Sequence, residues 1–295
     1  MKLRVLGAGA GGGLPQWNCA CRNCTDARNG KIEPMTQSSL AASIDGKRWV
    51  LMNASPDIIT QINRCEELHP RKLRHSPIKA AILTNGDIDH IGGLLSLREK
   101  TAFVVYGTQE ALEILRTNAV FNVLDPDLVS RIPLQLDEPI EPVPGLKVTP
   151  FSVPGKVALY LEGDKIELAE IGEQTVGLLL ECETATLAYV PGCAALPDWL
   201  LERLAEADVL LFDGTVWEND DMSRTGTGTK SGKRMGHIPM AGTGGSLDRL
   251  EWFAGRKIYV HINNTNPILQ PCGPERQTAV AKGWEIAYDG MEITL

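Results

Sequence analysis

The chain has 295 residues, is 43% hydrophobic and carries a formal charge of -8 at pH 7, with a pI of about 5.3. This length and apolar content suffice for a large core, and the acidic balance without basic blocks argues against a nucleic-acid surface. No apolar run approaches the roughly 18 residues that span a bilayer, and the N-terminal run is too short for a signal peptide. A cytoplasmic protein without membrane association is therefore expected.

Apolar runs, turn residues and helical spacing predict the elements of the first half of the chain. In order they are a strand at 2–7, a hairpin of strands at 39–45 and 48–55, a helix at 55–65, a strand at 79–85, a helix at 91–99, a strand at 102–108 and a helix at 109–117.

The second half begins with a run of strands and then alternates. Its predicted elements are strands at 146–153, 157–164, 175–182 and 185–192, a helix at 198–208, a strand at 209–215, a helix at 246–255, a strand at 257–264, a helix at 274–283 and two short strands within 284–295. Strands with interspersed helices, in two similar halves, indicate an α/β protein. The polar, glycine-rich stretch 220–245 is long for a loop and is a candidate functional segment.

The sequence GAGAGG after the first strand fits the dinucleotide-binding pattern G-x-G-x-x-G through Gly7, Gly9 and Gly12. That fingerprint requires a helix that opens on the glycines and holds the pyrophosphate at its N-terminus. Here Gly13, Pro15 and several cysteines follow, which make a poor helix. The glycines are expected instead to let the chain turn close to another backbone, beside a bound group.

Three of the seven cysteines lie close together, as C-x-C-x-x-C at Cys19, Cys21 and Cys24. In a reducing compartment this clustering indicates a metal site rather than disulfides, although three ordinary loop residues are the alternative. Three thiolates hold a tetrahedral Zn²⁺ in a structural role and leave one vertex for a distant ligand. Cys272 is the first candidate for that ligand, and the weaker candidates are Asn264, His69 and His75.

Residues 83–94, LTNGDIDHIGGL, lie where a predicted strand passes into a helix, a place at which α/β folds bind ligands. Alternate spacing brings Asn85, Asp87 and Asp89 to one side, with His90 adjacent. The side chains are of metal-ligand type. The alternative is a polar loop that caps the helix through Asp89.

Two further strand ends carry ligand-type groups, since Asp213 ends the run VLLF and His261 follows KIYV. One more histidine, His237, lies in the long glycine-rich loop. A single histidine on an apolar strand is usually a core residue. Three strand ends with such side chains, counting His90, indicate a shared site instead.

LTNGDIDHIGGL resembles the H-x-H-x-D-H-x-G-G motif of the metallo-β-lactamase superfamily, with Asn85 and Asp87 in place of the two leading histidines. The C-x-C-x-x-C loop resembles the structural zinc loop of its phosphodiesterase branch. The strings GGGLPQWNC, NASPDI, DHIGGLLSLRE, MGHIPM and HINNTNPIL closely resemble the family of B proteins of pyrroloquinoline quinone (PQQ) biosynthesis. The resemblance implies one metallo-β-lactamase-like domain over 1–295, an αββα sandwich of two packed mixed β-sheets flanked by helices.

The departures from the metallo-hydrolases concern the metal ligands. Lys156 follows the P-G turn where the middle histidine stands, and Cys193 replaces the bridging aspartate. A dinuclear zinc site needs more ligands than remain. What the resemblance leaves is one metal bound by Asp89, His90 and His261.

Two histidines and one carboxylate with open positions form the ligand set of non-haem Fe(II) oxygenases. With the family resemblance, this implies iron-dependent, O₂-using hydroxylation of the tyrosine ring of a cross-linked glutamate–tyrosine intermediate, a small amino-acid-derived substrate. Other PQQ-pathway proteins are candidate partners. Two alternatives stay open, a non-catalytic carrier or transport protein for PQQ and a residual zinc phosphodiesterase-like hydrolase.

Supporting roles follow from the same resemblance. Asn85 or Asp87 is expected to orient a ligating histidine through its free ring N–H. Asp213 is expected to be a further ligand or supporting group, and His237, which resembles the mobile-loop histidine of the phosphodiesterase branch, an acid/base or a carboxylate-binding residue. The cations of the same loop are candidates for binding an acidic substrate, with a solvated loop as the alternative. They are Lys230, Lys233 and Arg234.

Overall fold

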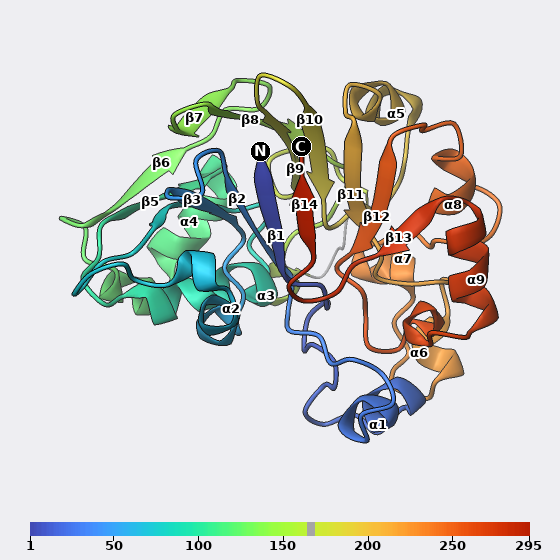
Figure 1. The fold of residues 1–295 in the computed structure, drawn as a ribbon. Helices are drawn as coiled ribbons and strands as arrows, with labels where there is room; N and C mark the ends of the chain where they lie inside the picture. The colour runs from blue at the N-terminus through green and yellow to red at the C-terminus, as the bar shows by residue number, and fades with distance from the viewer. Residues whose placement is uncertain (164–168) are drawn as a thin grey trace.

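The structure is a computed structural model that describes residues 1–163 and 169–295. Two seven-stranded mixed sheets pack against each other, with helices on their outer faces (Figure 1). The first sheet has the order β14 (Glu292–Thr294), β1 (Lys2–Gly7), β2 (Ser39–Ser43), β3 (Trp49–Met52), β4 (Ile78–Ile82), β5 (Phe103–Gly107) and β6 (Val129–Pro133). The second has the order β13 (Trp284–Ile286), β12 (Arg256–Val260), β11 (Val209–Asp213), β10 (Thr186–Val190), β9 (Val176–Glu181), β8 (Leu146–Ser152) and β7 (Ile140–Val143).

The two sheets have matching topologies. In the first, β14, β1, β2 and β3 are antiparallel neighbours, and β3 to β6 run parallel. In the second, β7 to β10 are antiparallel neighbours, and β10 to β13 run parallel. The fold therefore confirms the predicted pair of packed mixed sheets, and it places the carboxyl ends of two sets of parallel strands at one edge of the molecule.

Alternation along the strands divides the apolar residues between two cores. On β3, Val50 and Met52 face the core between the sheets, whereas Trp49 and Leu51 face a second core beneath the helices that cover the first sheet. Successive strand side chains point to opposite faces, so a strand buried on both faces is apolar throughout. This explains why runs such as WVLM show no alternation of polar and apolar residues.

The helices are short and lie outside the sheets. The α-helices are α1 (Arg22–Arg28), α2 (Ile58–Arg64), α3 (Ile88–Ile91), α4 (Gln109–Thr117), α5 (Asp198–Leu204), α6 (Asp221–Arg224), α7 (Gly232–Met235), α8 (Ser246–Arg249) and α9 (Pro274–Ala281). The 3₁₀ helices are η1 (Glu66–Leu68), η2 (Gly92–Leu97), η3 (Ala119–Val123), η4 (Leu159–Leu161) and η5 (Pro267–Leu269). None of those in the described parts of the chain is both long and apolar enough to cross a bilayer.

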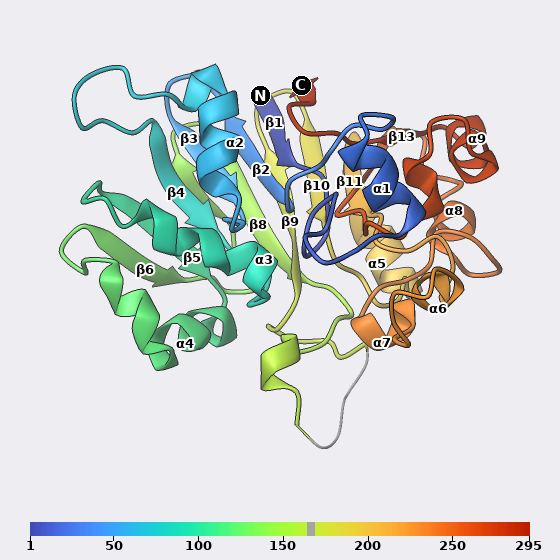
Figure 2. The same ribbon diagram turned by 90° about the horizontal axis from the view of Figure 1, so that it is seen from below.

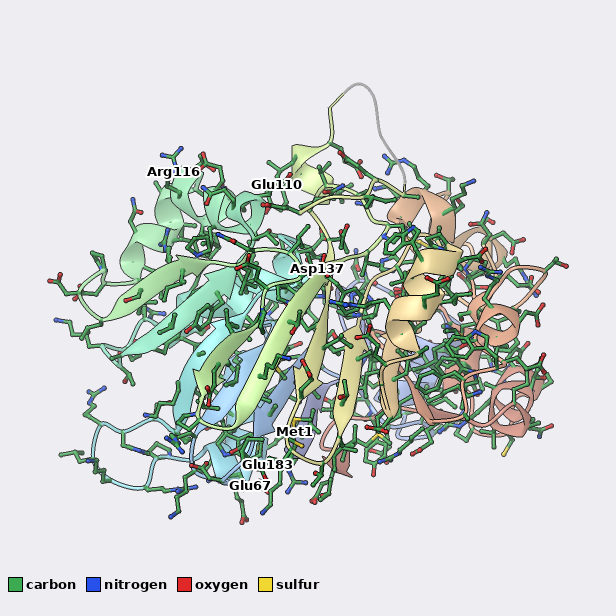
Figure 3. The ribbon with its side chains drawn as sticks, turned by 90° about the horizontal axis from the view of Figure 1, so that it is seen from above. Met1, Glu67, Glu110, Arg116, Asp137 and Glu183 are labelled. Atoms are coloured by element: carbon green, nitrogen blue, oxygen red, sulfur yellow. The ribbon has the colours of Figure 1, made fainter. Side chains whose placement is uncertain are left out.

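Helix α4 illustrates how these short helices are fixed. The Thr108 hydroxyl accepts a hydrogen bond from the Ala111 N–H and caps the helix, and such a cap contributes about 1 kcal/mol. Leu112 and Leu115 pack under the helix, while Glu110 and Arg116 point away from the sheet, as Figure 3 shows.

Several element predictions were wrong. The predicted strand at 157–164 is not a strand over 157–163, where the chain makes the single turn η4, and residue 164 lies outside the described residues. Strands β6 and β7 were missed because Pro133 and the prolines around β7 interrupt their apolar pattern. The helix predicted at 91–99 is mostly the 3₁₀ helix η2, and that predicted at 246–255 ends at Arg249.

The glycines of the N-terminal loop and of the DHIGG motif serve close packing. A Cβ on Gly93 would lie 2.0 Å from the Ser55 carbonyl oxygen, and one on Gly7 would lie 2.1 Å from the Gln37 carbonyl oxygen. The first helix after β1 is α1, so no helix opens on GAGAGG. The dinucleotide pattern is therefore coincidental, and Gly11 instead lies beside Asp89.

Candidate metal centre

Loops that follow strands of both sheets bring the predicted ligands to one cavity. Asp89 and His90 lie on α3, which follows β4, and His261 follows β12. Ligand atoms of these three side chains all lie within 4.8 Å of one another. In Figure 1 this edge is at the bottom, and Figure 2 views the molecule from that side, with α1, α3 and α7 nearby. The cavity has a volume of about 290 Å³.

His90 has the environment of a metal ligand. Its ring is buried, and Nδ1 lies 2.7 Å from the Asn85 side-chain oxygen. Since that oxygen only accepts, Nδ1 carries the proton and Nε2 offers its lone pair. Nε2 is buried and has no hydrogen-bond partner among the described residues, which is costly unless a metal binds there. Burial lowers the pKa of His90 to about 4, so the ring is neutral at pH 7.

His261 is oriented in the same manner by Thr215. The Thr215 hydroxyl lies 2.7 Å from Asp213 Oδ1 and 2.8 Å from His261 Nδ1. An ionised carboxylate only accepts, so the hydroxyl donates to Asp213 and accepts from Nδ1–H of His261. His261 has a φ of 55°, a left-handed backbone conformation that is strained for a residue with a side chain. No sequence signal pointed to Thr215.

His261 Nε2 and Asp89 Oδ2 lie 3.1 Å apart, and both are acceptors when the His261 ring is neutral with its proton on Nδ1. Such a pair is stable only with a positive charge between the atoms, a proton or a metal ion. The pKa values report the same preference. Burial by itself would raise the pKa of Asp89, yet His90 and His261 hold it below its usual range. Burial would lower the pKa of His261, yet its hydrogen bond to Asp89 and the nearby carboxylates raise it. The donor set therefore fits a cation.

Asp213 and His237 form a second layer beside this group. Asp213 is fully buried, and its Oδ2 lies 2.7 Å from His237 Nδ1 and accepts from the Cys193 N–H at 2.9 Å. The His237 ring stacks on that of His261 with 5.3 Å between centroids and lines the cavity. Asp213 lies behind these rings, so it supports His237 and Thr215 and is not exposed to the cavity, although it could join His237 and His261 around a cation.

The structure separates the two candidates for orienting a ligating histidine. Asn85 contacts His90, as described above. Asp87 does not bond a histidine, and its Oδ1 accepts from the Leu159 N–H at 3.4 Å. Burial, with the charge of Asp89, raises the pKa of Asp87. Asp87 therefore belongs to the cavity wall, and Asn85 is the one of the two candidates that contacts a ligating histidine among the described residues.

Only two of the three candidate cations of the 220–245 loop face the cavity. Lys230 and Arg234 line it, whereas Lys233 is exposed. Lys156, from the P-G turn, also lines the cavity and lies 3.1 Å from Glu162, which Arg234 binds with both guanidinium nitrogens. Glu162 was not foreseen from the sequence.

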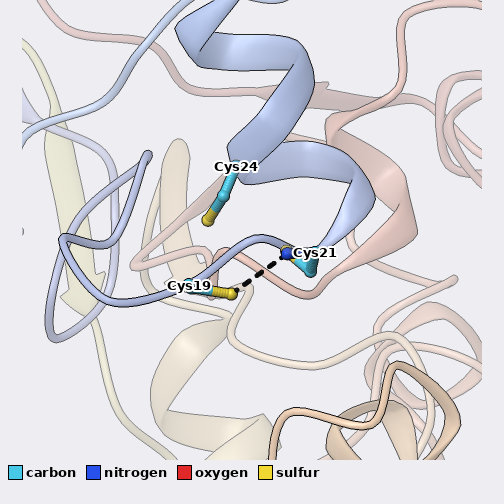
Figure 4. A group of neighbouring side chains, drawn as sticks. All are labelled: Cys19, Cys21 and Cys24. Carbon is cyan, nitrogen blue, oxygen red and sulfur yellow. Dashed lines mark hydrogen bonds between the residues drawn. The ribbon is translucent and has the colours of Figure 1, made fainter.

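The three clustered cysteines converge at the start of α1, as Figure 4 shows. The Asn264 side-chain nitrogen lies 3.3 Å from Cys19 Sγ and 3.2 Å from Cys24 Sγ. Burial raises the pKa of the Cys21 thiol to about 12, so three thiolates are stable together only with a cation among them. The cluster fits a thiolate metal site.

The first candidate for the fourth ligand was wrong. Cys272 is exposed and is not part of the cluster among the described residues, whereas Asn264, a weaker candidate, is in contact with it. His69 and His75 bond within their own region, to the Asn63 carbonyl and the Arg71 N–H.

The fold and the site define a protein of the metallo-β-lactamase superfamily, and the family model described as "Beta-lactamase superfamily domain" matches residues 48–262. Coenzyme PQQ synthesis protein B from Ruegeria pomeroyi is 53% identical over 100% of both chains, and that from Rhizobium meliloti is 54% identical over 100% of this chain and 98% of the relative. The chain belongs to the family of coenzyme PQQ synthesis protein B.

Solved structures agree with this assignment. The crystal structure of Zn²⁺-bound PqqB from Methylobacterium extorquens matches with a TM-score of 0.99 and 52% identity over 100% of both chains. A diphosphatase from the PhnP family matches with a TM-score of 0.69 at 20% identity, over 100% of this chain and 97% of that one, which shows a shared fold alone.

Proposed function

We propose that the protein acts in PQQ biosynthesis as a non-haem Fe(II) hydroxylase of the tyrosine ring in a cross-linked glutamate–tyrosine intermediate. The observation that carries this proposal is the group of Asp89, His90 and His261, two histidines and a carboxylate facing one cavity. The pathway follows from the family, whose members are named for coenzyme PQQ synthesis. The superfamily fold and the zinc bound by the Methylobacterium relative support a metal-dependent enzyme.

The neighbouring side chains support a single metal rather than the hydrolytic pair. At the positions of the two absent leading histidines, Asn85 bonds His90 and Asp87 faces Leu159. At the middle-histidine position, Lys156 pairs its ammonium group with Glu162. A second metal bound there would have an ammonium group as a neighbour instead of a ligand. This weakens the hydrolase alternative.

Ring hydroxylation needs a metal with redox chemistry, and Fe(II) in this ligand set supplies the activation of O₂, which Zn²⁺ does not. The protein's own groups position the reaction. Asn85 and Thr215 hold the ligating histidines in the tautomer that leaves Nε2 free. His237 Nδ1 bonds Asp213, so its Nε2 faces the cavity, where it is suited to bind or accept the phenolic proton.

We further propose that Cys19, Cys21 and Cys24 hold a structural Zn²⁺ and that the amide of Asn264 completes the site. The Asn264 side-chain nitrogen faces the sulfurs, so the amide would turn to present its oxygen to the metal. Three thiolates and that oxygen would make a closed tetrahedral set, which contributes folding free energy. Asn23 donates from its side-chain nitrogen to the Asn264 carbonyl at 2.9 Å, so the cluster also fixes the loop that follows His261.

The test of the hydroxylase is iron reconstitution without oxygen, followed by addition of O₂, a glutamate–tyrosine adduct and a two-electron reductant such as ascorbate, because the second oxygen atom must leave as water. The expected result is O₂ consumption and a mass gain of one oxygen on the ring, lost in His90→Ala and retained in the control His75→Ala. An adduct that stays unmodified while the protein holds iron at this site would refute the proposal, and tight PQQ binding unaffected by Asp89→Ala would then favour the carrier alternative.

A further inference from the structure

The cavity wall contains a three-residue ion cluster in which Glu162 and Lys156 are buried and Arg234 is partly exposed. Glu162 accepts from Arg234 at 3.0 and 2.7 Å, and Lys156 Nζ lies 3.1 Å from its Oε1. The side chains of Glu162 and Lys156 are 8% and 10% exposed, and all three residues line the cavity that holds the metal-ligand group. A planar guanidinium and an ammonium on one carboxylate form the contacts by which proteins recognise carboxylate ligands.

The two cationic residues are held firmly by the surrounding chain. The Lys156 stem passes over Gly236, where an added Cβ would lie 3.0 Å from Lys156 Cγ. Helix α7, which carries Arg234, is capped by Ser231, and the chain just after it is bound to the loop that follows β10 by the hydrogen bond from the Ile238 N–H to the Cys193 carbonyl at 2.6 Å. The backbone that carries Arg234 and the stem of Lys156 are therefore held by contacts that do not involve Glu162.

Glu162 is attached less firmly. It follows η4, whose three residues, Leu159 to Leu161, expose 53%, 44% and 48% of their surface although all are large and apolar. Among residues 1–163 and 169–295, the side-chain hydrogen bonds that link this turn to the cavity wall run from the Tyr160 hydroxyl to the Gly86 carbonyl, at 2.6 Å, and from the Leu159 N–H to Asp87, at 3.4 Å. An element with few buried contacts opens at low free-energy cost.

We propose that Lys156 and Arg234 form a receptor for a carboxylate of the substrate, and that Glu162 is an internal carboxylate that occupies this receptor until the substrate displaces it. The ligand class rests on the proposed function, because a glutamate–tyrosine intermediate carries carboxylates. Exchange of one carboxylate for another leaves the local charge unchanged. Without Glu162, the empty protein would leave the buried Lys156 ammonium and the partly buried Arg234 guanidinium without this counter-charge, which is unfavourable.

The exchange also provides specificity. The Arg234 contact holds the pKa of Glu162 at about 2, so the side chain is an ionised competitor at neutral pH. A ligand that lacks a carboxylate at this position gains nothing from the cations and leaves Glu162 in place. A ligand that carries a carboxylate there gives Lys156 and Arg234 the same contacts that they lose when Glu162 leaves. Specificity is the difference between the affinities for ligands with and without this carboxylate, and Glu162 enlarges it by opposing the ligands that lack one.

The test measures binding of PQQ, an acidic aromatic probe, and of its neutral methyl ester to the iron-free protein. Glu162→Gln should bind PQQ about tenfold more tightly than the parent protein, because the competitor is gone, and Arg234→Gln about tenfold more weakly. The double variant should show no gain, since the gain requires Arg234. Methyl-ester binding should change in none of them. Glu285→Gln is the matched control, since Glu285 makes a like two-bond pair with Arg256, at 2.6 and 2.8 Å, where β12 begins.

Thermal unfolding identifies any variant that has lost its fold. If Glu162→Gln is such a variant, Lys156→Met and Arg234→Gln provide the test, because each must lower the affinity for PQQ and leave the affinity for the methyl ester unchanged. The inference is overturned if folded Glu162→Gln binds PQQ no more tightly than the parent, or if the ester gains equally. Because no iron or O₂ is present, failure here is distinct from failure of the hydroxylase proposal.

Discussion

The cysteine cluster and the histidine–aspartate cavity are neighbours that differ in construction. One loop serves both, since His261 faces the cavity and Asn264, three residues later, contacts the cysteines. The cysteines come from one short stretch and face an amide, whereas the cavity ligands come from two sheets and face open space. A site closed by its own chain is suited to holding structure, and a site with an open side is suited to chemistry. The predictions below test this division.

The largest effect is expected at the cavity. His90→Ala should lower hydroxylation by about a thousandfold or more, because one of three metal ligands is lost. The melting temperature should stay within a few degrees of the parent value. Turnover of the adduct and thermal unfolding check both points, with His75→Ala as the matched control. If His90→Ala lowered the melting temperature strongly but kept its turnover per folded molecule, His90 would have a structural role and not a catalytic one.

The opposite pattern is expected at the cluster. Cys21→Ser should remove the zinc and lower the melting temperature by about 10 °C, because a closed zinc site contributes folding free energy. Well below that temperature, hydroxylation should fall by less than about tenfold, since the iron ligands remain. Metal analysis and calorimetry measure the effects, and Cys182→Ser, outside the cluster, should resemble the parent. Unchanged stability after zinc loss would argue against a structural role.

A smaller effect should distinguish two neighbours in the opening motif. Asn85→Ala should weaken iron binding by about 10- to 100-fold, because His90 loses the acceptor that sets its tautomer. Asp87→Asn should change iron affinity much less, since Asp87 contacts Leu159 and no histidine. Anaerobic iron titrations provide the values. Equal losses in the two variants would show that charge near the metal matters more than ring orientation.

The smallest effect concerns the fourth zinc ligand. Asn264→Ala should raise the rate of zinc release to a chelator by several-fold, since one of four ligands is lost while three thiolates remain. Cys272→Ser should release zinc as slowly as the parent, because Cys272 is exposed and outside the cluster. The reverse order would restore Cys272 as the ligand.

Much of the fold and of the site was accessible from the sequence because the signals are local. Apolar runs located most strands, and the ligands follow them, His261 directly after β12 and Asp89 and His90 on the short helix after β4, where a parallel sheet gathers its ligands. The three cysteines within six residues need no tertiary information to be seen as a cluster. These features depend on the spacing of residues along the chain, which can be read from the sequence without knowledge of tertiary contacts.

The misses depended on contacts between distant segments. Thr215 orients His261 from 46 residues away, and Asn264 meets cysteines 240 and 245 positions earlier, so neither role leaves a local pattern. Glu162 ends a continuous apolar run that predicts a strand but folds as the turn η4, in which Leu159, Tyr160 and Leu161 are exposed. Its pairing with Arg234 exists only in three dimensions.

The central claim is that two sites of different chemistry take different metals. X-ray absorption at the iron and zinc edges, on protein loaded with Fe(II) without oxygen, tests it most directly. The account predicts iron with only nitrogen and oxygen neighbours and zinc with sulfur neighbours at about 2.3 Å. Sulfur around the iron, or zinc bound only by nitrogen and oxygen after iron loading, would contradict it.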